Sequence, residues 1–347
     1  MTATAAVLRG HAGFIATASP LYSDLMLRLA DDIDAGGPAA AVVDGEAPAD
    51  WQDAFALRLM AAVHCAVLER RAPALALHYP SVGGDGRADL AWPALRALMV
   101  EQPEQLRRDL ARPCQTNDPG RSAALLVGLL QAVQVTGVGD VRLLEIGASA
   151  GLNLRVDAFR VGDRGPADSP CVVADPWPDG QPPRPAWRLV DRRGCDPDPV
   201  DPTSAGGRLA LTASVWADQL PRFERLRGAL EVARRVPAWV DRSGAADWLP
   251  DRLAIPREDV LTVVWHSVVR QYVDPGEWAE VEATIAAAPG LVAHVAMEPA
   301  MPTDPDGMAV TVSFAGEAPV RVATAGPHGP PVRLAVPMAV RMAVRMA

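Results

Sequence analysis

The stretch Val141-Arg-Leu-Leu-Glu-Ile-Gly-Ala-Ser-Ala-Gly151 decides the expected fold, because a short apolar segment runs into a turn made only of small residues. We expect a strand over Val141–Ile146, since most of its side chains are apolar. The residues Gly147–Gly151 are all Gly, Ala or Ser, which lets a backbone approach a ligand closely. A helix is expected over Gly151–Phe159, and the first N–H groups of a helix can face a ligand.

Strands and helices alternate on the C-terminal side of this turn. The expected helices are Pro221–Arg235 and Gly276–Ala288. The expected strands are Cys171–Ala174, Trp187–Arg193, Leu261–Ser267, Leu291–Met297, Met308–Phe314 and Val320–Ala323. This alternation predicts the α/β class, with a Rossmann-like, mostly parallel sheet.

The N-terminal side of the turn has a helical pattern and no convincing strand. The expected helices are Pro20–Asp32, Trp51–Arg71, Trp92–Arg112 and Arg121–Val135. We therefore divide the chain into a helical N-terminal or cap region (1–135), a sheet domain (136–336) and a tail (337–347). Met-Ala-Val-Arg repeats in the tail, so we expect no catalytic role for it.

The composition excludes several classes of protein. The net charge of −9 disfavours binding to a nucleic-acid backbone. The sequence contains no lysine, which excludes Schiff-base enzymes and P-loop enzymes. Its four cysteines form no CxxC pair, so we expect no metal site. With neither a signal-peptide pattern nor a membrane-spanning apolar run, we expect a cytoplasmic protein that contacts no membrane.

The turn at 145–151 is compatible with three kinds of ligand chemistry. S-adenosylmethionine enzymes place an acidic residue before a glycine-rich turn, as Glu145 stands here before Gly147, with Ser149 at the position of the middle glycine. Nicotinamide enzymes use G-x-G-x-x-G, which this segment breaks. Gly147-Ala-Ser-Ala-Gly151 also matches the G-x-S-x-G nucleophile elbow of α/β-hydrolases. A structural glycine turn without a ligand is the remaining alternative.

The hydrolase interpretation is the weaker one, although an Asp and then His266 or His294 follow Ser149 in the required order. That fold places several strands before the elbow, whereas residues 1–135 are expected to be helical. Its elbow strand is also apolar, whereas this one carries Glu145. A buried carboxylate needs a hydrogen-bond donor, which a ligand or a neighbouring arginine can supply.

Several segments together resemble one bacterial family, domain of unknown function 2332, which is common in actinobacteria. The segments that carry the resemblance are Gln115–Arg121, Glu145–Leu154, Arg193–Asp201, Trp216–Gln219 with Arg222, Arg225 and Leu226, Asp247–Leu249 and His266–Tyr272. The resemblance implies a Rossmann-like methyltransferase fold but no proven activity. It departs from the methyltransferase pattern at Gly244-Ala-Ala-Asp247, where the acid expected to contact adenine is displaced.

From the turn and the resemblance we expect an S-adenosylmethionine-dependent methyltransferase acting on a small molecule. The expected cofactor-binding residues are Glu145, Gly147, Ala148, Ser149, Gly151, Asn153, Asp196 and Arg121. Asp196 would accept the ribose hydroxyls and Arg121 would pair with Glu145 or with the cofactor carboxylate. The alternatives for these two residues are a solvated loop aspartate and a surface arginine beside an N-cap at Asn117 or Asp118.

The substrate side of the expected pocket comes from the ends of two later strands. His266, Tyr272 and Glu298 are the candidate catalytic residues, because strand C-termini line the ligand crevice of open α/β sheets. A hydrogen-bonded structural histidine is the alternative for His266. The whole chain has two further interpretations, a degenerate cofactor-binding protein without activity and a serine hydrolase that uses Ser149.

Overall fold

The computed structural model describes residues 1–46, 48, 54–299 and 307–335. The chain forms two compact units, one made of residues 1–116 with 204–224, the other of residues 117–203 with 225–347. We call them the helical unit and the sheet unit. The tail at 337–347 and positions 51–53 of the expected helix Trp51–Arg71 lie outside the described residues.

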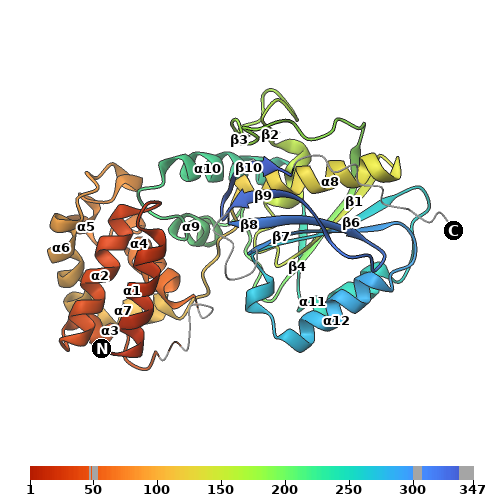
Figure 1. The fold of residues 1–347 in the computed structure, drawn as a ribbon. Helices are drawn as coiled ribbons and strands as arrows, with labels where there is room; N and C mark the ends of the chain where they lie inside the picture. Colours follow the sequence, from red (N-terminus) through yellow and green to blue (C-terminus); the bar gives the residue numbers. More distant parts are fainter. Residues whose placement is uncertain (47, 49–53, 300–306, 336–347) are drawn as a thin grey trace. The chain divides into compact units, whose positions relative to one another are not determined.

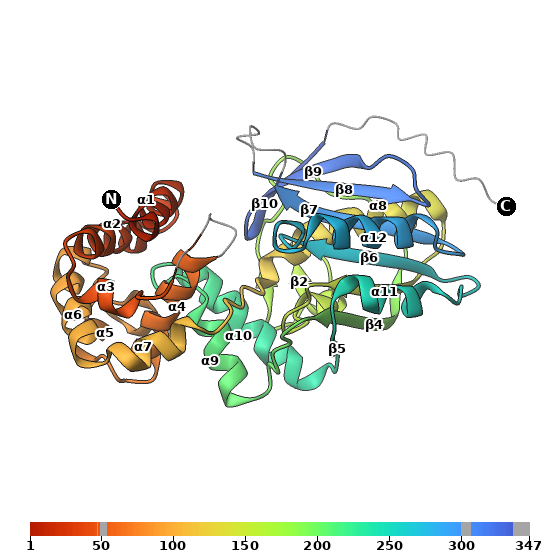
Figure 2. The same ribbon diagram turned by 90° about the horizontal axis from the view of Figure 1, so that it is seen from below.

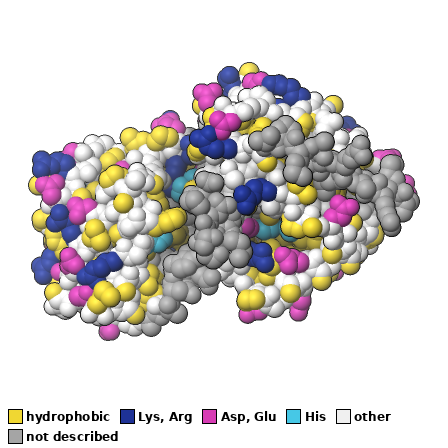
Figure 3. Space-filling model, in the orientation of Figure 1, with side chains coloured by type: hydrophobic (Ala, Val, Ile, Leu, Met, Phe, Trp, Pro, Cys, Tyr) yellow, Lys and Arg dark blue, Asp and Glu magenta, His cyan; other side chains and the backbone are white. Residues whose placement is uncertain are grey.

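The helical unit is built from short helices around one apolar core. Its helices are α1 (Ala3–Ile15), α2 (Pro20–Asp34), α3 (Pro38–Val42), α4 (Phe55–Leu68), α5 (Pro73–Ala76), η2 (Pro80–Val82), α6 (Ala88–Glu101), α7 (Pro103–Leu110), α9 (Ala205–Ala213) and the first residues of α10 (Leu220–Arg235). Buried side chains such as Leu25, Leu59 and Leu95 fill the core, and each stabilises the unit by about 1.5–3 kcal/mol. On the face shown in Figure 3, arginine and acidic side chains are interspersed over this unit.

The expected helix over Trp92–Arg112 is wrong, because the chain forms α6 and α7 there instead of one helix. Pro103 starts α7, and the preceding Gln102 has φ −133° and ψ 43°, outside the helical region. Proline lacks an N–H and disfavours a helical conformation in the residue before it, so the helix is interrupted at this point.

The sheet unit holds an eight-stranded sheet in the order β10-β9-β8-β7-β6-β1-β4-β5. The strands are β1 (Asp140–Ile146), β4 (Arg188–Asp196), β5 (Trp239–Arg242), β6 (Leu261–Ser267), β7 (Val292–Pro299), β8 (Met308–Phe314), β9 (Val320–Gly326) and β10 (Gly329–Leu334). Strands β5, β4, β1, β6 and β7 are parallel, and β8, β9 and β10 extend the sheet in antiparallel fashion. The expected α/β class with a mostly parallel sheet is confirmed.

Helices cover both faces of this sheet (Figures 1 and 2). On one face lies α8 (Ser122–Thr136), which approaches β7 so closely that a Cβ on Gly128 would stand 2.2 Å from Val295 Cγ1. On the other face lie α11 (Ala245–Leu253) and α12 (Pro275–Ala286), packed with Leu144 and Val264 of the sheet. A small sheet of β2 (Arg160–Val161) and β3 (Val172–Val173) belongs to the β1–β4 connection.

Strands β2, β5 and β10 and helices α9 and α11 are among the elements that were not expected from the sequence. β5 has only four residues and follows Pro237, and β10 contains Pro330 and Pro331, which suits an edge strand. Helices α9 and α11 are also short, with nine residues each. The first five parallel strands in chain order are arranged 3-2-1-4-5, so the connections change direction between β1 and β6. Ligands of open α/β sheets bind at this point, outside the C-terminal strand ends.

Candidate functional site

Glu145 lies near the C-terminal end of β1, beside the point where the strand order reverses. Glu145 is only 2 % exposed, and its Oε2 atom has no hydrogen-bond partner among the described residues. In the sheet register it is paired with Trp265, whose indole N–H faces the Glu145 carboxyl and lowers its pKa, although the two groups form no hydrogen bond of normal geometry. A buried carboxyl oxygen without a well-formed hydrogen bond is rare in folded proteins and is compatible with a group that it would bind.

The surroundings of Glu145 determine its protonation. Burial raises the pKa of the Glu145 carboxyl to about 8, although the Trp265 indole and the positive charges of Arg121 and Arg155 act in the opposite direction. Asp196 adds a smaller effect that also raises this pKa. At pH 7 the carboxyl is therefore mostly protonated, and it can both donate and accept a hydrogen bond.

The small-residue turn adopts left-handed backbone conformations, with φ of 64° at Gly147, 51° at Ser149 and 62° at Gly151. Its amide groups bond within the protein: Ala148 N–H donates to the Cys195 carbonyl at 3.0 Å, and Gly151 N–H to the Ala148 carbonyl. Ser149 N–H donates to Asp196 Oδ2 at 2.8 Å. The turn is thus fixed mainly by its own hydrogen bonds and by those to the end of β4.

The helix expected over Gly151–Phe159 is a short 3-10 helix, η4 (Asn153–Ala158), interrupted by non-helical angles at Arg155. Leu152 N–H, just before it, donates to Asn117 Oδ1 at 2.8 Å. A helix is therefore present as expected, but the amide just before it is not open to a ligand, because a side-chain acceptor from another segment pairs with it. A helix this short also has little macrodipole to attract an anion.

Asp196 ends β4 and lies beside the turn, as expected from the sequence. Its carboxylate accepts Ser149 N–H through Oδ2 and Asp198 N–H through Oδ1, each at 2.8 Å. Burial raises the pKa of this carboxyl despite these two donors. A carboxylate has about four lone-pair sites, so two remain for ligand hydroxyl groups.

Arg121, just before α8, and Asn153, the first residue of η4, are both buried, so Arg121 is not a surface arginine. The Arg121 guanidinium donates through Nε to the Pro327 carbonyl at 3.0 Å and through Nη1 to the Ser267 carbonyl at 3.2 Å. Asn153 Nδ2 donates to the Asp118 carbonyl, whereas its Oδ1 is buried without a partner among described residues. Arg121 thereby places a positive charge near Glu145, and Asn153 adds a second unused acceptor oxygen.

The candidate catalytic residues His266 and Glu298 form a second group. Glu298 Oε1 lies 2.6 Å from His266 Nδ1, and His266 Nε2 lies 2.9 Å from His294 Nε2. Both ring nitrogens of His266 are therefore engaged inside the protein. Burial lowers the pKa of His294 to about 3, with smaller effects from His266 and Arg270. Tyr272 is 50 % exposed in η5 (Arg270–Tyr272).

Glu145 and the His266–Glu298 pair face opposite sides of the sheet. Side chains alternate along a strand, and the neighbours Leu144 and Ile146 belong to the core beneath α11 and α12. His266 is paired with Ile146 in the register and packs on Trp278 of α12, with ring centroids 4.8 Å apart. Glu145 therefore points to the α8 side, away from His266.

The loop after β6 contacts both Glu298 and the small-residue turn beside Glu145. Glu298 Oε1 also accepts the Val269 N–H at 3.0 Å, and Val268 next to it has φ 56°, a rare conformation for a β-branched residue. The Val269 side chain covers the turn, since a Cβ on Gly147 would stand 2.4 Å from Val269 Cγ2. Sequence reasoning did not single out Val269, because a valine carries no chemical signal before the fold is known. It named Asn117 as a possible N-cap beside Arg121, whereas the structure has Asn117 Oδ1 accepting the Leu152 N–H.

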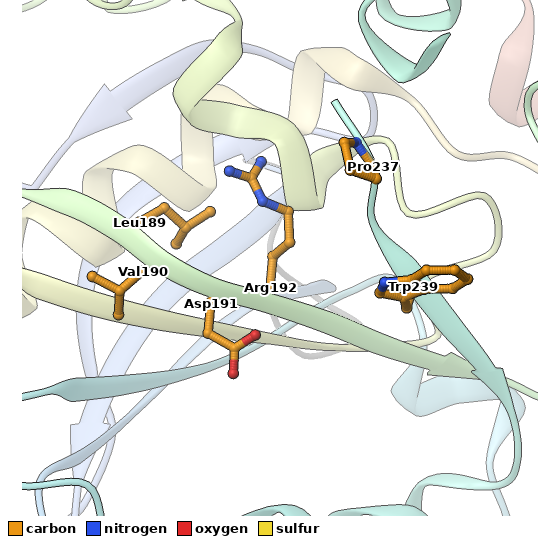
Figure 4. Close-up of a pocket in the computed structure, with 6 residues that line it drawn as sticks. All are labelled: Leu189, Val190, Asp191, Arg192, Pro237 and Trp239. Carbon is orange, nitrogen blue, oxygen red and sulfur yellow. The ribbon is translucent and has the colours of Figure 1, made fainter. Parts of the chain in front are cut away.

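A shallow pocket of about 250 Å³ lies elsewhere on the sheet unit, lined by Leu189, Val190, Asp191, Arg192, Pro237 and Trp239 (Figure 4). These β4 residues lie opposite the first half of β1, since Val141 is paired with Leu189 and Glu145 with Gly194. The pocket is therefore at the opposite end of β1 from the turn. Among the described residues, no group of three or more His, Cys, Asp or Glu side chains could hold a metal ion.

The fold and this site define a class: an open α/β protein with a helical N-terminal segment and a small-residue turn at the strand-order reversal. Residues 5–333 match the family model described as "Uncharacterized protein conserved in bacteria (DUF2332)", so the chain belongs to that family. No curated protein and no solved structure matches the chain. None of the described helices has the length and apolar character needed to cross a bilayer.

Proposed function

We propose that the sheet unit binds S-adenosylmethionine and that the protein is a methyltransferase with a small-molecule acceptor, in a Rossmann-like methyltransferase fold. The observation that carries the proposal is the buried Glu145 carboxyl, whose Oε2 has no partner among described residues, beside a small-residue turn at the reversal of strand order. The 3-2-1-4-5 order of the parallel strands supports the Rossmann-like part.

The residues around the turn fit such a ligand through their side chains. Glu145 and Asn153 Oδ1 offer acceptors for an ammonium group, and the unused lone pairs of Asp196 suit ribose hydroxyls. Arg121 would supply positive charge toward the ligand carboxylate. Because the amides of Ser149 and Leu152 are already paired, the side chains, rather than the turn backbone, would hold the ligand.

S-adenosylmethionine would supply an electrophilic methyl group on a sulfonium. The contribution of the chain would be alignment and exclusion of water, which can account for much of the barrier reduction. The positive charge of a bound ligand would favour the ionised form of Glu145, which without the ligand is mostly protonated at pH 7. His266 would act on a substrate only if it released His294 or Glu298, so we give it a positioning role through the Glu298 contact to the Val269 loop.

A degenerate cofactor-binding protein is the second candidate, and one observation favours it. Val269 lies against Gly147, and Asp196 and Asn117 occupy the amides that a ligand would use. A serine hydrolase based on Ser149 and His266 has less support, because both nitrogens of that imidazole are bonded to Glu298 and His294.

Calorimetry and thermal denaturation of the full chain with S-adenosylhomocysteine test the proposal. At a ligand concentration 100 times the dissociation constant, stabilisation should be about 2.7 kcal/mol. Asp196→Ala should weaken binding, whereas Asp198→Asn, two residues further on, should keep it. Lack of binding by S-adenosylmethionine and S-adenosylhomocysteine, or equal binding of NAD, would overturn the proposal. Binding without methyl transfer to a broad acceptor panel would favour the degenerate protein.

A further inference from the structure

His64 is a fully buried imidazole within the helical unit, on α4. Its ring packs against the ring of Tyr79, with centroids 5.7 Å apart, and edge-on against Phe223 at 5.8 Å. Burial lowers the pKa of His64 to about 4, and hydrogen bonds to the Ala213 and Val215 backbone only partly offset this effect. The ring is therefore neutral near pH 7 and keeps one nitrogen lone pair.

The hydrogen bonds of His64 determine which nitrogen carries that lone pair. Nδ1 lies 3.2 Å from the Ala213 carbonyl oxygen, which can only accept, so Nδ1 carries the proton. Nε2 is then the acceptor, and it lies 2.8 Å from Ser81 Oγ. The Ser81 hydroxyl thus donates to a neutral imidazole whose tautomer a third group holds in place, an arrangement typical of nucleophilic catalysis.

Ser81 stands on a turn that the backbone holds rigidly. Gly83 has φ 90°, and a Cβ on Gly84 would stand 2.3 Å from the Tyr79 nitrogen, so both positions need glycine. A hydrogen bond of 2.9 Å between His78 Nδ1 and Asp85 Oδ1 ties the two ends of this turn together. Ser81 itself is only half-buried, so part of the residue is open to solvent.

Two further hydroxyl groups belong to the same cluster. The side chains of Tyr79 and Tyr22 are fully buried, with ring centroids 6.0 Å apart, and their hydroxyl groups interact with each other. They enclose the His64 side of the cluster. The cluster therefore contains a nucleophile, a base and a group that orients the base.

We propose that Ser81 and His64 form a nucleophile–base pair in the helical unit, which reacts with acyl donors such as esters of small carboxylic acids. The proposal rests on the 2.8 Å contact, the fixed tautomer and the rigid turn, none of which depends on the ligand of the sheet unit. The proposal is therefore independent of the methyltransferase proposal.

The chemical step balances with the ester and water alone. Ser81 Oγ forms a bond to the acyl carbon while its proton moves to His64 Nε2. The bond from that carbon to the alcohol oxygen breaks, and the alcohol leaves with the proton from Nε2. Water, deprotonated by the same nitrogen, then releases the acid and restores the serine hydroxyl.

Labelling of the full chain with a biotinylated fluorophosphonate, followed by tryptic mapping, tests the pair directly. Because the sequence has no lysine, trypsin yields separate peptides for Ser81 (72–87), Ser149 (143–155) and the control Ser23 (10–28). We expect the adduct on Ser81, at least 100-fold faster than on Ser23, and its loss in urea. His64→Gln should slow labelling by about 100-fold or more, since a general base contributes roughly 10²–10⁴.

The wild-type map decides the outcome even if His64→Gln fails to fold. An adduct on the 143–155 peptide alone, no adduct on the 72–87 peptide, or equal labelling in native and urea-treated protein would each overturn the proposal. Ser81→Ala should abolish both the adduct and the burst of p-nitrophenol from p-nitrophenyl acetate. The same variant should bind S-adenosylhomocysteine as the wild type does, which separates this result from the test of the sheet unit.

Discussion

Replacing Glu145 by Gln removes a buried carboxyl and should change how stability depends on pH. The carboxyl has a pKa of about 8 in the folded protein, compared with 4.5 for the free group. Between these two values the folded state holds a proton that the unfolded state releases. Stability from this group is therefore greatest at low pH and is lost as the pH rises toward 8.

The size of the effect follows from these two pKa values. Between pH 5 and pH 8 the free energy of unfolding of the wild-type protein should fall by about 3.5 kcal/mol because of Glu145 alone, at about 1.4 kcal/mol per pKa unit. Gln has nearly the same shape and no titration, so Glu145→Gln should become more stable relative to wild type by about this amount over the same range.

Urea denaturation at several pH values, monitored by tryptophan fluorescence, measures this difference. Taking the difference between variant and wild type cancels the titration of other groups, such as His294. Glu280→Gln, at an exposed position on α12, is the matched control and should leave the pH dependence unchanged. If wild type and Glu145→Gln differ by a constant amount from pH 5 to pH 8, the burial argument for Glu145 is wrong.

Three further substitutions test the packing and the electrostatics of the sheet unit by the same denaturation assay. Gly147→Ala should lower the free energy of unfolding by about 1–2 kcal/mol because of the φ of 64° at this position. The contact of the new Cβ with Val269 should lower it by about 1–3 kcal/mol more. The double variant with Val269→Ala should recover only this second loss. Gly128→Ala should lower the free energy of unfolding by about 1–3 kcal/mol, because the new Cβ would clash with Val295, and by less when Val295→Ala is also present. The His294→Gln variant should lose less stability than the wild type when the pH drops from 6.5 toward 3. The lowered pKa of His294 makes the stability of the wild-type protein fall over this range.

A specific result would contradict each of these three predictions. Equal costs of Gly147→Ala with and without Val269→Ala would mean that Val269 does not cover the turn. A Gly128→Ala variant as stable as wild type in both backgrounds would mean that α8 and β7 do not approach closely. An acid transition that is the same for wild type and His294→Gln would show that this imidazole is not buried in its neutral form.

The order of strands and helices after residue 140 could be predicted because it depends on local pattern. Strands β1 and β6 are rich in Val and Leu, and helices α8 and α10 are long, with 15 and 16 residues. Weakly patterned elements could not be predicted: β5 has four residues, and β10 contains two prolines. Their pairing depends on strands already in the sheet, which supply the missing hydrogen-bond partners.

The sequence by itself determined that Glu145 ends a strand before a small-residue turn and that Asp196 and His266 end two other strands. Only the tertiary structure decided how these residues are grouped. Strand alternation directs Glu145 toward α8 and His266 toward α12, and the turn amides pair with Asp196 and with Asn117 from a distant segment. The physical reason is that burial, register and hydrogen-bond partners come from residues far apart in the chain, whereas a local pattern specifies only the element on which each residue lies.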